Sequence, residues 1–165
     1  MLLEINGWKF DLNLEETMVY SSKVLSDQCQ CGYCRNFYKA IDGSYPELRS
    51  FLAKFGMRVE TPEELMPFEP TVYTVSYCIS GRIISRSVYP LEGGGTVFSV
   101  ATQEEMPFET QCASPYFVLT SGFLEFPWLL DEDMNEVVST ANEPEFLEKM
   151  WNRLLNHVED SNLIS

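Results

Sequence analysis

The spacing of hydrophobic residues changes at residue 71, and this change constrains the fold more than any other feature of the sequence. In TVYTVSYCI a large hydrophobic side chain recurs at every second position, at Tyr73, Val75, Tyr77 and Ile79. This period predicts a β-strand with one face in the core. Ser80-Gly81 predicts a turn into a second strand, RIISRSVY, while TVFSVAT and PYFVLTSGFLEF predict further strands after a glycine loop. Strands joined by short turns pair antiparallel.

The region before residue 71 shows helical spacing instead. In SYPELRSFLAKFG, Ser44 and Glu47 form a capping box, apolar residues follow at three- and four-residue intervals, and Gly56 supplies the stop. We therefore expect a helix over residues 45–55. TPEEL repeats the start signal with Thr61 as the cap and predicts a short helix that the following prolines end.

Both ends of the chain complete the predicted fold. Asn6-Gly7 lies between two strand-like segments and suits a tight type I′ turn, which predicts an N-terminal hairpin. A broad apolar stripe over residues 143–158 predicts a terminal helix that packs on the sheet. With a further helix expected over residues 33–42, residues 1–165 form a single α+β domain. We expect an antiparallel sheet of about five to seven strands, with two helices after the hairpin.

Charge limits the classes of partner. The chain has 25 acidic and 11 basic residues among its 165, a net charge of -14. Such a surface repels phosphate backbones and anionic membranes, so we expect neither nucleic acid nor membrane as a partner, and a basic protein is the partner that the charge favours. No segment has the basic start and apolar run of a signal peptide, or the length of a membrane span, which favours a cytoplasmic protein.

Three of the five cysteines lie within six residues, in CQCGYC. An odd number of cysteines, three of them crowded, excludes a complete set of internal disulfides and favours free or metal-bound thiols. From Cys31 onward, Cys34, Phe37, Tyr38 and Ile41 follow helical spacing, so the sulfurs can point inward. Burial in the core at the helix start is the interpretation we favour, because free cysteine behaves as a small hydrophobic residue.

Zinc is the first alternative. Cys29, Cys31 and Cys34 supply three ligands, and Cys78, on the strand face opposite Tyr73, is the first candidate for the fourth. Two weaker candidates for the fourth position are Cys112 and His157. The absence of a second CxxC or HxxxH weakens this interpretation, because zinc ribbons and fingers usually bring two matched pairs of ligands.

Thiol redox chemistry at Cys31 and Cys34 is the second alternative. A helix N-terminus would favour the Cys31 thiolate, although the polar segment upstream is unlike the buried strand that precedes a thioredoxin-type site. No other grouping points to catalysis. The single histidine, His157, sits beside Leu154 and Val158 on the expected terminal helix and is expected at its surface or boundary, and the carboxylates are typical of helix caps and turns. We therefore expect a small acidic binding domain without catalysis, with a cysteine-cluster protein as the alternative.

The segments CxCxxCRNFYKAI, LRSFLAKFG, TPEEL and FLEFPWLLDED together resemble a group of small bacterial proteins of unassigned function. The resemblance covers most of the chain and implies that these segments belong to one domain. It implies no catalytic residue, cofactor or partner.

Overall fold

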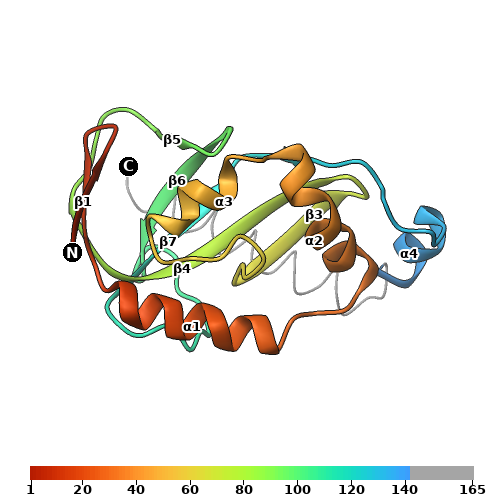
Figure 1. Cartoon of the computed structure of the whole chain (residues 1–165), viewed down its shortest axis with the longest axis horizontal. Coiled ribbons are helices and arrows are strands. Elements are labelled where there is room, and N and C mark those ends of the chain that lie inside the picture. Colours follow the sequence, from red (N-terminus) through yellow and green to blue (C-terminus); the bar gives the residue numbers. More distant parts are fainter. Residues whose placement is uncertain (142–165) are drawn as a thin grey trace. The chain divides into compact units, whose positions relative to one another are not determined.

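The computed structural model describes residues 1–141. The chain divides into two compact units, Met1–Leu129 and Leu130–Ser165. The first unit holds an antiparallel sheet and three helices, while helix α4 (Met134–Ala141) belongs to the second (Figure 1). The predicted α+β class is therefore confirmed. The predicted helix over residues 143–158 lies outside the described residues, and the single domain stays a prediction.

The sheet of the first unit has eight strands, one more than the upper end of the predicted range. They are β1 (Leu2–Ile5), β2 (Trp8–Leu12), β3 (Glu64–Glu69), β4 (Val72–Ser85), β5 (Leu91–Gly93), β6 (Thr96–Thr102), β7 (Tyr116–Ser121) and β8 (Leu124–Glu125). Every pairing is antiparallel, in the order β1-β2-β4-β7-β6-β5, with β3 and β8 also paired to β4.

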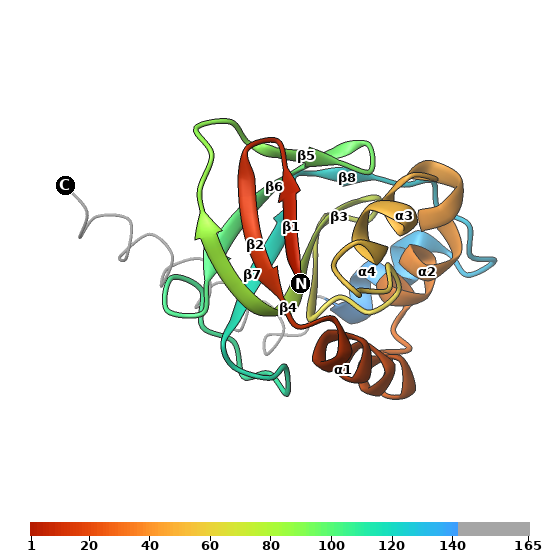
Figure 2. The same ribbon diagram turned by 60° about the vertical axis from the view of Figure 1, so that its left-hand side comes forward.

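The N-terminal hairpin forms as predicted. Asn6 and Gly7 have φ angles of 51° and 81°, the positive values that a type I′ turn needs at both central positions. Strand β2 then pairs with the end of β4, which places the hairpin beside that part of the sheet (Figure 2).

The predicted turn at Ser80-Gly81 is wrong, because β4 continues through both residues as one 14-residue strand. Its first half pairs with β3 and its second half with β2, so the strand gains partners along its whole length. Gly81 adopts φ 143°, and a Cβ there would lie 2.3 Å from the carbonyl oxygen of Asp11 on β2. The glycine therefore permits a close approach of two strands rather than a reversal of the chain.

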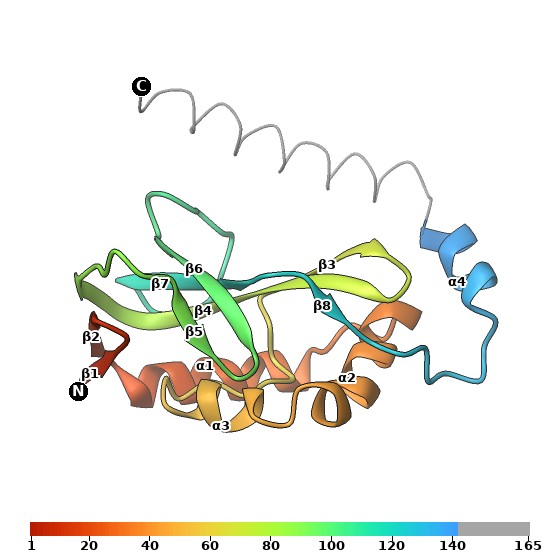
Figure 3. The same cartoon turned by 90° about the horizontal axis from the view of Figure 1, so that it is seen from above.

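Three helices cover one face of the sheet: α1 (Leu14–Ser26), α2 (Gly32–Ser44) and α3 (Leu48–Ala53) (Figure 3). The sequence analysis missed α1, although Asn13 gives its start signal. The Asn13 side chain accepts a hydrogen bond from the backbone N–H of Glu16, as an N-cap residue does.

The helix predicted over residues 33–42 is present as α2, whereas the helix predicted over residues 45–55 starts later and is shorter than expected. Ser44 is the last residue of α2 rather than a cap, and α3 begins at Leu48 without a side-chain cap. Gly56 follows α3 with φ 76°, as expected of a helix stop. The short helix predicted at Thr61 is wrong, because the Thr61 hydroxyl bonds Ser21 of α1 and the chain enters strand β3 instead.

The core lies between the sheet and the helices. Tyr73, Val75 and Tyr77 of β4 are fully buried, as the two-residue period predicted. Phe10 of β2 stacks on Phe117 of β7 at 5.0 Å between ring centroids, and Tyr33 of α2 meets the edge of Tyr73. These contacts hold the first residues of α2 against the sheet.

Candidate functional site

The three clustered cysteines meet at the start of α2. The sulfur atoms of Cys29, Cys31 and Cys34 all lie within 4.8 Å of one another. Cys29 and Cys31 are exposed, and Cys34 is half-buried. The favoured interpretation, burial in the core, is therefore wrong for Cys29 and Cys31. Both residues precede the helix, so its apolar face does not direct their side chains.

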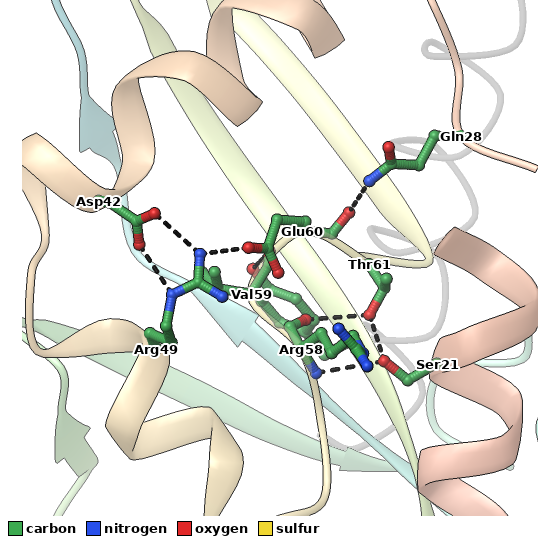
Figure 4. Close-up of polar contacts among 9 residues, drawn as sticks. Ser21, Gln28, Asp42, Arg49, Arg58, Val59, Glu60 and Thr61 are labelled. Carbon is green, nitrogen blue, oxygen red and sulfur yellow. Dashed lines mark hydrogen bonds and ion pairs between the residues drawn. The ribbon is translucent and has the colours of Figure 1, made fainter. Parts of the chain in front are cut away.

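Hydrogen bonds within the loop between α1 and α2 fix its shape. The Arg35 guanidinium donates to the carbonyl of Gln30 at 2.9 Å, and the backbone N–H of Cys31 points at the Cys29 sulfur at 3.5 Å. The Gln28 side chain donates to the carbonyl of Glu60 at 2.8 Å (Figure 4). The loop is thus tied at one end to a neighbouring segment and at the other to the first turn of α2.

The segment that anchors Gln28 is itself held by charge and hydrogen bonds. Arg49 of α3 pairs with Asp42 of α2 and with Glu60 (Figure 4). On the other side, the hydroxyls of Ser21 and Thr61 lie 2.6 Å apart and link α1 to the same segment. Polar contacts therefore link α1, α2 and α3 to the segment of Glu60, and the Glu60 carbonyl anchors the cysteine loop through Gln28.

The three sulfurs are not electrostatically equivalent. A hydrogen bond from the Cys34 side chain, together with backbone N–H groups of the first turn, lowers the pKa of Cys31 to about 5. The same hydrogen bond and burial raise the pKa of Cys34. In the metal-free cluster, Cys31 is therefore the more acidic thiol of the pair and Cys34 the less acidic one.

Tyrosines line the buried side of the cluster. Burial raises the pKa of Tyr38, and the neighbouring sulfurs of the cluster raise it further. Burial and the Cys31 charge likewise raise the pKa of Tyr33. The phenols therefore stay protonated at neutral pH and remain donors beside the sulfurs.

Cys78 lies in a different place. It is fully buried on β4, where burial and the charge of Glu63 raise its pKa. Burial also raises the pKa of its neighbour Cys112 to about 12. Among the residues that the structure describes, neither cysteine joins the cluster of three, and no other Cys, His, Asp or Glu does so. The remaining candidate, His157, lies outside the described residues.

Comparison with known proteins yields no match to a protein family, to a curated protein or to a solved structure. Within residues 1–141, no helix has both the length and the hydrophobicity that crossing a membrane requires. The chemistry of the site therefore has to be inferred from its own residues.

Sequence reasoning found the three cysteines but missed the groups that arrange them. The side chains of Gln28 and Arg35 donate hydrogen bonds to backbone carbonyls. Every residue has such a carbonyl, so no pattern in the sequence reveals the partner. Tyr38 was placed on an apolar helix face, where its ring does pack against Phe37, but the nearby sulfurs of the cluster also raise its pKa.

The lowered pKa gives a testable reactivity. In metal-free protein, Cys31 should react with iodoacetamide almost as fast at pH 6.5 as at pH 8, because it is already a thiolate at both. An ordinary thiol, with a pKa of about 8.5, would react roughly 20-fold more slowly at the lower pH. Mass spectrometry of labelled peptides measures this. Equal, strongly pH-dependent labelling of Cys29 and Cys31 would contradict the assigned hydrogen bonds.

Proposed function

We propose that the protein binds a thiophilic metal ion, zinc in the first instance, through Cys29, Cys31 and Cys34. The observation that carries the proposal is the convergence of the three sulfur atoms to within 4.8 Å of one another. Cysteine thiolates are preferred ligands of zinc and of other soft metal ions. A redox pair would require only two of these sulfurs, whereas a metal site uses all three.

The spacing of the sulfurs suits such an ion. Zinc–sulfur bonds of about 2.3 Å in a tetrahedron place the sulfurs about 3.8 Å apart. Sulfurs that already lie within 4.8 Å therefore need to close by only about 1 Å, which small changes in side-chain torsions supply. The ordered loop favours binding because few torsions have to be fixed when the ion enters.

The environment also suits a thiolate site. The backbone N–H of Cys31 points at the Cys29 sulfur at 3.5 Å. Donors of this kind orient the ligands and stabilise their negative charge. Three protein ligands leave a fourth position for water or for a ligand from outside the described residues.

Elemental analysis combined with thiol counting tests the proposal. The full chain, purified without chelator, should carry about one equivalent of zinc. Cys29, Cys31 and Cys34 should resist alkylation until a chelator removes the metal. Cys112→Ser is the matched control, because it removes a cysteine outside the cluster and should leave the metal content unchanged. Protein that stays metal-free after incubation with zinc, with all three thiols reactive, would contradict the proposal.

A second candidate function is the binding of a basic protein. It is supported by the net charge of -14 and by the ion pairs of Lys9, Arg49 and Arg86, which already engage these cations with carboxylates of the same chain. The acidic excess is then available to a partner of opposite charge.

Salt dependence tests this second candidate. Retention of a basic partner from a cell extract should fall several-fold between about 50 mM and 500 mM salt, because the Debye length shrinks from about 14 Å to about 4 Å. A surface variant with two exposed glutamates changed to glutamine, Glu15 and Glu104, should retain less of the partner at low salt. Recovery of acidic proteins or nucleic acid instead would contradict this function.

A further inference from the structure

The cysteine cluster combines two features, the proximity of its sulfurs and their exposure to solvent. Its sulfurs are close enough to ligate one ion, yet Cys29 and Cys31 are exposed to solvent. A structural zinc site usually has all four coordination positions filled by protein ligands, whereas this cluster supplies three among the described residues. Exposed, mutually close thiolates can instead be reached by small oxidants, and reactivity of cysteine follows thiolate character and exposure.

Cys31 and Cys34 have the arrangement of an oxidisable pair. Cys31 is the N-cap of α2, and its side chain is exposed. A helix N-terminus favours the thiolate. Cys34, one turn later, lies within 4.8 Å of it. Forming a disulfide of about 2.05 Å therefore requires an approach of less than about 3 Å.

We propose that the metal site is controlled by peroxides: oxidation of Cys31 and Cys34 to a disulfide expels the metal ion, and reduction by a dithiol restores binding. This inference rests on the proposed metal-binding function. It adds a mechanism that regulates metal binding, and it accounts for the exposure of the cluster to solvent.

The step balances as a two-electron oxidation. The Cys31 sulfur attacks one oxygen of a hydroperoxide, the O–O bond breaks, and the second oxygen leaves as hydroxide or alkoxide while Cys31 becomes a sulfenic acid. The Cys34 thiol then attacks the Cys31 sulfur and passes its proton to the departing oxygen, so the S–O bond breaks, water leaves and the disulfide forms. Two ligands are thereby lost, and Cys29 alone does not retain the ion.

Variants of Cys29 allow metal binding and disulfide formation to be tested separately. Cys29 ligates the metal in this account but takes no part in the disulfide. Cys29→Ser should therefore lose zinc and still form the Cys31–Cys34 disulfide. Cys34→Ser should lose zinc and form no such bond. Cys112→Ser is the matched control, and should bind and release zinc as the natural protein does.

The experiment treats the zinc-loaded full chain with hydrogen peroxide. A chelating dye measures released zinc, and mass spectrometry of peptides identifies the oxidised residues. We expect about one zinc released for each Cys31–Cys34 disulfide, and recovery of binding after dithiothreitol. Zinc that stays bound under peroxide, or release with sulfinic acid and no disulfide, would overturn the inference while the metal-binding function stands. Protein that holds no zinc before peroxide is added would overturn that function, and this inference with it.

Discussion

Replacing Cys31 by serine is expected to lower the affinity for zinc about 100-fold or more. Structural zinc sites with four ligands have apparent binding free energies of about 10 to 16 kcal/mol. If the four ligands contribute equally, each contributes about 2.5 to 4 kcal/mol of binding free energy, or roughly 100- to 1,000-fold in affinity. Serine keeps the size of the side chain but is not a thiolate ligand, and it leaves the hydrogen-bonded loop at Arg35 and Gln30 in place.

Competition with a chromophoric chelator measures this affinity. Cys112→Ser provides the control, since Cys112 is buried away from the cluster. Circular dichroism should show that Cys31→Ser remains folded, because Cys31 is exposed. An affinity of Cys31→Ser within a factor of three of the natural protein would mean that Cys31 is not a ligand.

Changing Gly81 to alanine should destabilise the fold by about 2 to 6 kcal/mol. A Cβ at this position would lie 2.3 Å from the carbonyl oxygen of Asp11 and 3.1 Å from the Cα of Leu12. Both are backbone atoms of strand β2, so neither can turn aside. The φ of 143° adds about 1 to 3 kcal/mol of backbone strain for a residue with a side chain, and forced overpacking adds a similar amount.

Urea denaturation measures the loss, and Gly43→Ala is the matched control. Gly43 lies in α2, and a Cβ there meets no atom within 4 Å. Alanine at this site should stabilise the protein by about 0.5 to 1 kcal/mol, because it favours the helix. If Gly81→Ala costs less than about 1 kcal/mol, then β2 and β4 do not approach as closely as described.

The fold class was predictable because local patterns agree with it. Alternation along β4 and the Asn6-Gly7 turn depend on neighbours in sequence, and both are found in the structure. The secondary-structure predictions were wrong where contacts with distant segments determine the local structure. Thr61 looks like a helix cap, but the Ser21 hydroxyl on α1 bonds its side chain, and pairing with β4 makes the next residues a strand. Likewise, Gly81 suggests a turn in the sequence, but in the structure it pairs with β2 inside a continuous strand.

The sequence predicts which cysteines form the cluster but not how exposed they are. Helical spacing assigned Cys34 to the apolar face, and it is half-buried, whereas Cys31 has extended backbone angles before the helix begins. Cys78 shows the opposite case. The two-residue period places it on the face of β4 opposite Tyr73, and α2 packs on the Tyr73 face through Tyr33. A proposed fourth ligand on that strand face is therefore directed away from the helices.

X-ray absorption at the zinc edge tests the central claim most directly, that three cysteines of one loop and helix start hold a metal ion. The zinc-loaded full chain should show three sulfur neighbours at about 2.3 Å and one nitrogen or oxygen neighbour at about 2.0 Å. Four sulfur neighbours would require a further cysteine such as Cys78 and would contradict the three-thiolate site. A shell of nitrogen and oxygen alone would show that the zinc is bound elsewhere on the protein.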